Sequence, residues 1–177
     1  MQEGKLIFSQ IMAHVPKYEF SKCVKRYNGD YKVQKYNSWQ HFLCMAFAQL
    51  TYRDSLRDLI ICLNAMDSKL YGMGIRVRPT LSTVSDANRQ RDSRIYSDFA
   101  LHLIGIAREL YQEEPGVLNL KETVYALDSS TIDLCLTLFP WARFREHKAA
   151  VKLHTLLDLR GNIPSFIEIT DGKVHDV

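Results

Sequence analysis

The arrangement of apolar residues changes at about residue 120, and this change limits the possible folds more than any other feature of the chain. Before it, apolar residues recur at the three- and four-residue spacing of helices, as in LRDLIICL over residues 56–63. After it, short runs rich in Val, Ile, Leu and Thr are bounded by turn signals, which is typical of strands. Pro115 and Gly116 lie between the two patterns and indicate a linker. We therefore expect an α+β protein with a helical domain over residues 1–114 and a second domain over residues 119–177.

Several stretches of the first part carry helical spacing and boundary signals. They cover residues 7–12, 38–50, 51–66, 80–91 and 92–112. Pro16 ends the first helix, and Ser38, a good N-cap residue, begins the second. Gly72, Gly74 and Pro79 interrupt the helical periodicity, which indicates a basic loop over residues 69–80. We interpret the aromatic residues of the second helix as core: Trp39, Phe42 and Phe47.

Three strands are predicted in the second part, over residues 123–136, 149–159 and 163–170. About three residues join the second strand to the third, so we expect these two strands to form an antiparallel hairpin. Three strands without a covering helix bury little apolar surface. The sheet is therefore expected to be incomplete within this chain.

Composition narrows the class of protein. The chain has 177 residues, of which 46% are apolar and 24% are charged, as in ordinary globular proteins. It contains no run of 18 or more apolar residues and does not begin with a signal-peptide pattern, so we expect a cytoplasmic protein with no membrane partner. The four cysteines are far apart and mostly lie in apolar stretches. This pattern favours reduced, buried thiols over disulfides or a zinc site.

Charge is distributed unevenly between the two parts. Residues 1–100 hold fifteen Lys and Arg against nine Asp and Glu, whereas residues 101–177 hold eight against eleven. This asymmetry permits a nucleic-acid-binding part ahead of a carboxylate-bearing part. The helices could form a helix-turn-helix whose phosphate contacts come from nearby arginines. The candidates are Arg76, Arg78, Arg89, Arg91 and Arg94. The alternative is a solvated helical face, because Asp86 and Asp92 lie among these arginines.

The stretch YALDSST places a carboxylate, Asp128, at the end of an apolar run that we expect to be a buried strand. A carboxylate on a rigid strand can hold Mg²⁺, which prefers oxygen ligands. The alternative is a strand-end carboxylate that faces water or is capped by Ser129, Ser130 or Thr131. Phosphodiester chemistry with two metal ions needs two or three converging carboxylates, and the chain offers one clear member of such a set.

Other polar residues of the strands have simpler interpretations. Asp133 lies five residues after Asp128, an odd offset that places it on the opposite face of a regular strand, and we expect it to be structural. Lys152 and His154 share a face of the second strand, where they either approach a phosphate or line a solvated face. No glycine-rich phosphate loop, H-E-x-x-H or G-x-S-x-G motif is present, so nucleotide hydrolysis and serine-hydrolase chemistry are not indicated.

Long stretches of the chain resemble bacterial transposases of the insertion sequence 4 family. In the second part the resemblance covers YALDSSTIDLC and LFPWARFREHKAAVKLHTLLDLRGNIPSFIEITDGKVHDV. In the first part KRYNGDYKVQKYNSWQHFLCMAFAQLTYRDSLRDL and TLSTVSDANRQRDSRIYSDFA are similar to the family's N-terminal domain. The resemblance implies a ribonuclease H-like catalytic domain, of which the first three strands are present. It also implies a site of two aspartates and one glutamate that binds two divalent ions, Mg²⁺ or Mn²⁺.

By position, Asp128 matches the family's first catalytic aspartate, so the resemblance makes it a catalytic and metal-binding residue. The helical part would bind double-stranded DNA at the terminal inverted repeats of the mobile element, with a homodimer as one possible assembly, in the bacterial cytoplasm near the nucleoid. The family's second aspartate and its glutamate lie beyond TDGKVHDV. We therefore expect a truncated transposase that does not cut or join DNA alone, with a non-catalytic DNA-binding fragment or an inactive remnant as alternatives.

Overall fold

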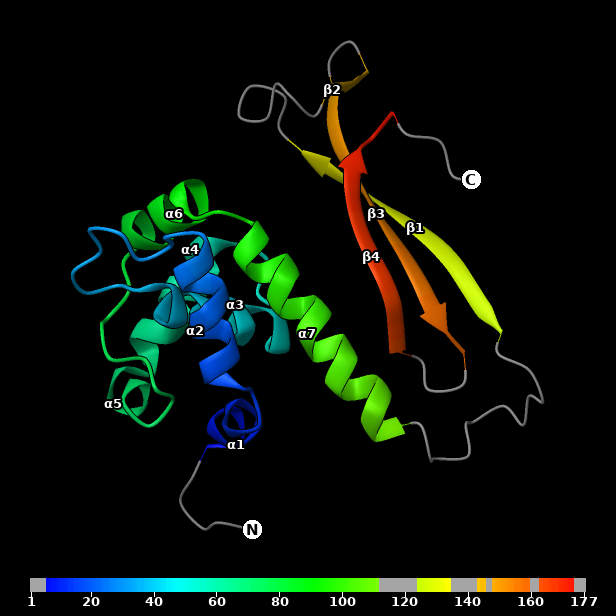
Figure 1. The fold of residues 1–177 in the computed structure, drawn as a ribbon. Coiled ribbons are helices and arrows are strands. Elements are labelled where there is room, and N and C mark those ends of the chain that lie inside the picture. Colours follow the sequence, from blue (N-terminus) through cyan, green and yellow to red (C-terminus); the bar gives the residue numbers. More distant parts are fainter. Residues whose placement is uncertain (1–5, 112–123, 135–142, 146–147, 160–162, 174–177) are drawn as a thin grey trace. The chain divides into compact units, whose positions relative to one another are not determined.

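The chain divides into two compact units, Met1–Phe99 and Ala100–Val177. The computed structural model describes residues 6–111, 124–134, 143–145, 148–159 and 163–173 (Figure 1). The first unit consists of helices and the second contains an antiparallel sheet, which confirms the expected α+β fold. The predicted linker around Pro115 and Gly116 lies outside the described residues. Within the described ranges, no helix is both long enough and apolar enough to cross a membrane.

Seven helices are formed by the described residues. They are α1 (Ile7–Ala13), α2 (Lys17–Arg26), α3 (Ser38–Leu50), α4 (Leu56–Ala65), α5 (Asp67–Leu70), α6 (Leu81–Gln90) and α7 (Arg94–Tyr111). The predicted helices are confirmed with small shifts of their ends. The sequence analysis missed α2, and the expected basic loop is wrong at its start, because Lys69 and Leu70 belong to α5. Leu70 is buried, and its burial stabilises a further helical turn at the place where a loop was expected.

The N-cap of α3 is Asn37 rather than Ser38. The Asn37 side chain accepts a hydrogen bond from the Gln40 backbone N–H at 2.9 Å. Ser38 is fully buried, and its backbone N–H and hydroxyl both donate to Asp30 Oδ1, at 2.6 and 2.8 Å. Asn and Ser are both residue types that cap helices well. Asn37 is the cap here because the Ser38 hydroxyl donates to Asp30 and does not accept from the helix. Asp30 thereby ties the loop after α2 to the first turn of α3.

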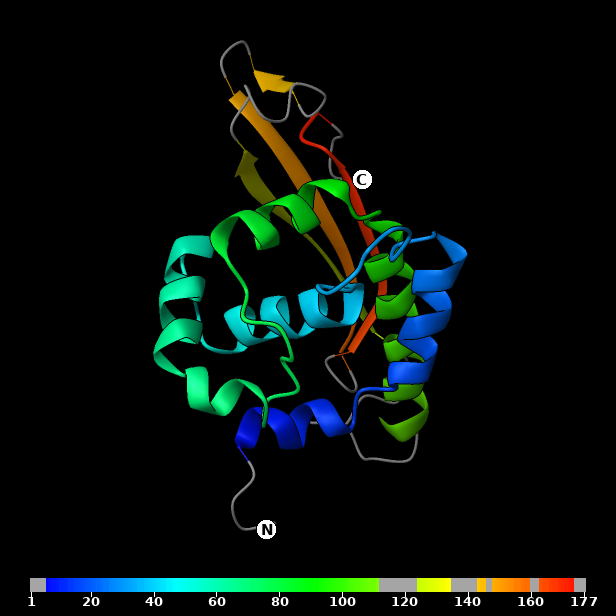
Figure 2. The same cartoon turned by 90° about the vertical axis from the view of Figure 1, so that its left-hand side faces the viewer.

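The core of the first unit forms around α3, which lies in the middle of the helices (Figure 2). α3 buries Leu43, Cys44 and Phe47, and α4 adds Leu59 and Leu63 from the face predicted for it. Full burial of a large apolar side chain contributes about 1.5–3 kcal/mol, so this cluster supplies a substantial core. At the other side of α3, Phe20 of α2 packs edge-on against Phe99 of α7, with 5.1 Å between the ring centroids.

The sheet of the second unit is built on one central strand. Its strands are β1 (Tyr125–Leu134), β2 (Arg143–Arg145), β3 (Lys148–Asp158) and β4 (Ile163–Asp171). β3 pairs antiparallel with β1, with β4 and, at its start, with the short β2. The predicted hairpin of the second and third strands is confirmed by the pairing of Asp158 with Ile163. A register shift opposite Leu156 and Leu157 leaves Ser165 as an extra residue of β4, beside Pro164, which cannot donate to the ladder.

Asp128 does not lie at the end of its strand, and it faces water, which is the alternative interpretation of this carboxylate. It lies within β1, opposite Thr155 of β3, and the strand continues for six residues beyond it to Leu134. Asp128 is exposed, and so are the apolar residues Leu127 and Ile132, at 55% and 48%. Among the described strands β1 pairs with β3 alone, and the apolar run that predicted a buried strand is exposed at these positions.

Candidate nucleic-acid interface

Four of the five arginines predicted as DNA ligands are engaged by protein groups. Arg94 Nη2 donates to Asp92 Oδ2 at 2.6 Å. Arg78 Nε donates to Asn64 Oδ1 at 3.0 Å and lies 3.6 Å from Asp67 Oδ1. Arg89 Nη2 donates to Asp86 Oδ1 at 2.9 Å. The ion pairs of Arg78 and Arg89 are largely exposed, and an exposed pair is worth at most about 1 kcal/mol. Either arginine could therefore exchange its partner for a phosphate at small cost.

Arg76 and Arg91 have different surroundings. The Arg76 guanidinium lies over the Tyr71 ring, with Cζ 3.8 Å from the ring centroid, and both side chains are exposed. Arg91 Nη2 donates to the backbone carbonyl of Tyr36, and its Cζ lies 5.5 Å from the Tyr36 ring centroid. Arg91 Nε and Nη1 are buried and have no hydrogen-bond partner among the described residues. Arg76 is thus presented to solvent, whereas Arg91 is held inside the protein.

Arg91 lies beside a buried polar network around His41. His41 Nε2 lies 2.7 Å from Asn88 Oδ1, and Nδ1 lies 2.7 Å from the Tyr96 hydroxyl. Because Asn88 Oδ1 can only accept, Nε2 carries the proton and Tyr96 donates to Nδ1. Burial and, secondly, the Arg91 charge lower the pKa of His41 from 6.5 to about 4. The network is therefore made of neutral groups that link α3, α6 and α7, and it is structural.

A second set of cations, which the sequence analysis did not single out, lies on α2. Two of its basic residues are neutralised: Lys22 Nζ lies 2.9 Å from Glu19 Oε1, and Arg26 pairs with Asp98. Lys17 and Lys25 are exposed and form no ion pair with any described residue. These two positive charges are therefore available to a ligand.

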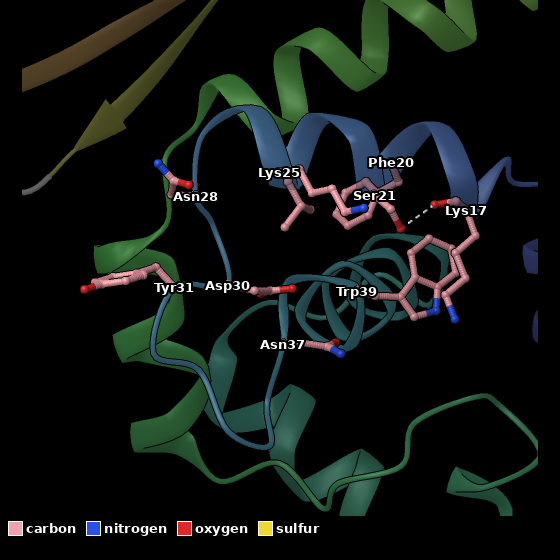
Figure 3. A pocket seen from close by; sticks show the side chains of 10 residues that line it. Lys17, Phe20, Ser21, Lys25, Asn28, Asp30, Tyr31, Asn37 and Trp39 are labelled. Atoms are coloured by element: carbon pink, nitrogen blue, oxygen red, sulfur yellow. Dashed lines mark hydrogen bonds between the residues drawn. The ribbon is translucent and has the colours of Figure 1, made fainter.

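Lys17 and Lys25 line a cavity of about 420 Å³ between α2, the loop that follows it, and the start of α3 (Figure 3). Its apolar lining comes from Phe20, Val24 and Trp39. Trp39 was predicted to be core, but it is only half-buried, in contrast to Phe47 with 4% of its surface exposed. Figure 3 shows Trp39 beside Lys17, whereas the Tyr31 side chain points away from Trp39.

In the described part of the sheet, no second metal-binding side chain lies beside the predicted metal ligand Asp128. The residues beside it in register are Thr155 of β3 and Ile167 of β4. No group of three His, Cys, Asp or Glu residues that could hold a metal ion occurs among the described residues. A magnesium site needs more oxygen ligands than this position supplies, so the described residues do not fit the expected two-ion centre.

The strand register settles which polar residues share a face with Asp128. Lys152 and His154 alternate on β3 and pair with Thr131 and Ser129 of β1, so they share a face, as predicted, and it is opposite to that of Asp128. His154 Nε2 lies 2.9 Å from Thr170 Oγ1 on β4. Asp133 pairs with Ala150 and also belongs to the face opposite Asp128, as predicted.

Comparison with known proteins gives one match. Residues 3–76 match the model of a domain of unknown function, DUF4372, a domain that is found in transposase-like proteins. The matched segment runs from the start of the chain to Arg76 and includes α1 to α5. No curated protein and no solved structure matches the chain.

Proposed function

We propose that the chain acts in DNA transposition and that its first unit binds double-stranded DNA at the ends of a mobile element. The observation that carries this proposal is the set of cations without acidic partners, among the described residues, on α2 and the loop after it. The set comprises Lys17, Lys25, Lys32 and Lys35. Phosphate neutralisation by such side chains supplies most of the affinity of non-specific DNA binding. The resemblance to transposases of the insertion sequence 4 family and the domain match over residues 3–76 support the same function.

We propose that Asp128 is the first carboxylate of a DNA-cleaving site on a ribonuclease H-like sheet. Its exposure on an ordered strand, in the middle of an antiparallel ladder, suits a residue that must reach a ligand. A divalent ion there would stabilise the charge that develops on phosphate oxygens, but it would need further carboxylates. DNA binding without cleavage is therefore the activity that we propose for residues 1–177 on their own. The buried core of the first unit favours such a binding protein over an inactive remnant.

Fluorescence anisotropy with a labelled random duplex of about 30 base pairs tests DNA binding. We expect binding at 50 mM salt that weakens at least tenfold at 200 mM, because each neutralised phosphate adds about −0.9 to the slope of log affinity against log salt. A duplex that carries the inverted repeats of the source element should bind more tightly than the random duplex. Absence of binding at 50 mM salt would refute the proposed function.

A plasmid-nicking assay with Mg²⁺ tests the role of the second unit. We expect no nicking by residues 1–177, and we expect Asp128→Asn to bind duplex DNA like the unmodified chain, because Asp128 is exposed and far in sequence from the cations of the first unit. Nicking by the unmodified chain that is lost in Asp128→Asn would contradict this expectation. It would show that Asp128 cleaves DNA together with metal ligands outside the described residues.

A further inference from the structure

We propose that the cavity between α2 and the start of α3 binds one unstacked nucleotide of a DNA single strand. The base would lie against Trp39 and the flanking phosphates would lie near Lys17 and Lys25. This inference rests on the proposed DNA-binding function and adds a preference for a region where bases are unpaired.

The cavity has the size and lining of a small-ligand site. Its volume of about 420 Å³ falls in the range of about 300–1,000 Å³ that is usual for such sites. Lys17, Ser21 and Lys25 lie at four-residue intervals on α2, so they follow one face of the helix along the cavity. Figure 3 shows these residues and Phe20 along one side, with Asp30, Asn37 and Trp39 opposite them. The site is thus a trough with cations on the helix side and an aromatic wall facing them.

The aromatic wall is held rigidly. The Trp39 indole stacks on Phe42, with an interplanar angle of 23° and 5.3 Å between ring centroids. It also meets Phe20 edge-on at 5.4 Å, and Phe20 is itself 99% buried against Phe99 and Phe42. Trp39 itself is only partly buried, so part of its surface remains open to a ligand. An indole that is fixed beforehand loses little entropy when a planar ring stacks on it.

The charge of the cavity selects for an anion. Lys17 Nζ lies over the Trp39 ring, 5.4 Å from its centroid, so a base that stacks on the indole takes the place of this ammonium and leaves it beside the flanking phosphate. The acidic residue of the lining, Asp30, already accepts two hydrogen bonds from Ser38 and is committed to the start of α3. The cations of α2 that point elsewhere are neutralised by Glu19 and Asp98, whereas those of the cavity are not paired with any described acid.

A nucleotide combines the two features that this cavity recognises, which are a planar aromatic ring and a phosphate. A base inside a duplex is stacked and paired and cannot reach a recessed indole without leaving the stack, which costs a few kcal/mol. An unpaired nucleotide reaches it without this cost. Single-strand sites elsewhere combine aromatic stacking with a cationic groove in this way, and each stacked base contributes about 1–3 kcal/mol.

The emission of Trp39 gives a direct test. The chain has two tryptophans, so Trp141→Phe leaves Trp39 as the only one, and this variant is titrated with the octamer (dT)₈. We expect saturable quenching of Trp39. The double variant Lys17→Gln, Lys25→Gln should weaken binding at least tenfold and reduce the salt slope by about 1.4, since each single-strand phosphate contributes about 0.7. Lys22→Gln is the matched control on the same helix and should change the affinity less than twofold, because Lys22 is already paired.

Two further ligands separate the possible sources of a signal. An abasic octamer has the same phosphates without bases and should bind at least tenfold more weakly, and thymidine monophosphate alone should bind far more weakly than (dT)₈. Equal binding of the abasic strand, equal binding of the free nucleotide, absence of quenching, or a double variant that behaves like Lys22→Gln would each overturn the inference. The abasic strand and the free nucleotide need no lysine variant, so they decide the matter even if the double variant does not fold.

The duplex measurement distinguishes the failure of this inference from the failure of the proposed function. Duplex binding without quenching by (dT)₈ would remove the single-nucleotide site and leave the proposed function intact. Quenching by (dT)₈ without duplex binding would keep the cavity as a single-strand site and refute binding to double-stranded element ends. Loss of both would refute both.

Discussion

The stability of the first unit should fall as the pH is lowered from 6.5 towards 4, because the fold holds His41 in its neutral form. Burial and the nearby Arg91 charge lower the pKa of His41 from 6.5 to about 4. The unfolded chain therefore binds more protons than the folded chain in this window. The contribution of neutral His41 is fully present above pH 6.5 and is lost as the pH falls through the folded pKa.

The hydrogen bond to Asn88 favours the protonated form of His41, but burial and the Arg91 charge outweigh it. Its two ring nitrogens contact Asn88 and Tyr96, the Tyr36 ring lies 6.0 Å away, and the nearest charge is the like charge of Arg91. The full shift corresponds to about 3 kcal/mol, of which about 2 kcal/mol is lost between pH 7 and pH 5. This loss is a large fraction of the roughly 5–15 kcal/mol that stabilises an ordinary domain.

Urea unfolding of the Trp141→Phe variant, followed by Trp39 emission at pH 7, 6 and 5, measures the effect in the first unit itself. His41→Gln should be less stable at pH 7 but should lose most of the dependence on pH. Asp92, whose pKa is lowered by its hydrogen bonds from Arg94, titrates below its ordinary value of 3.8 and does not act in this window. An equal pH dependence in His41→Gln, or a pKa near 6.5 for His41 in an NMR titration, would refute the reasoning.

Two further predictions concern packing and thiol reactivity. Gly29→Ala should destabilise the first unit by about 1–3 kcal/mol in urea unfolding, because the added Cβ would lie 2.4 Å from Cδ1 of the fully buried Ile95. Gly105→Ala, in the part of α7 that belongs to the second unit, is the control for glycine replacement: no described atom beyond its own helix backbone and chain neighbours lies within 4 Å of its Cβ, so the change should stabilise that helix by up to about 1 kcal/mol. A loss of stability in Gly105→Ala as large as that in Gly29→Ala would contradict the steric argument. Cys44 is fully buried, and burial raises its pKa to about 11, so iodoacetamide at pH 8 should label the partly exposed Cys62 and leave Cys44 unmodified until the protein unfolds. Peptide mass spectrometry measures this difference, and equal labelling rates in the native protein would contradict it.

The elements that the sequence predicted correctly are those whose signals are local. The apolar face of α4 is visible at residues 56–63, and the short joint of the β3–β4 hairpin is visible around residues 159–162. α2 was missed because KYEFSKCVKR buries only a narrow stripe, Phe20, Cys23 and Val24, within a largely polar segment. The cap of α3 was misplaced because the choice between two good cap residues depends on Asp30, which lies eight residues before Ser38.

The candidate interface was hard to predict because it also depends on contacts between residues that are distant in the sequence. A count of charges in the sequence treats every Lys and Arg alike, whereas the fold neutralises some of them through partners that are distant in the chain. The pair of Lys22 with Glu19 is readable at a spacing of three residues, but the pair of Arg26 with Asp98 joins residues 72 positions apart. Arg91 appeared to be a DNA ligand, yet it is held against the Tyr36 carbonyl.

This redistribution of charge changes which face of the first unit is expected to meet DNA. The arginines chosen from the sequence are distributed over the segment from Arg76 to Arg94, and four of the five already have partners within the protein. Lys17 and Lys25 have no acidic partner among the described residues, and they line the same cavity as the partly buried indole of Trp39. A phosphate that binds there replaces no acidic partner among the described residues, whereas one that binds at Arg78 or Arg89 must first replace a carboxylate. The lysine variants should therefore weaken DNA binding more, per charge removed, than Arg78→Gln or Arg89→Gln, and the reverse order would return the interface to the arginines.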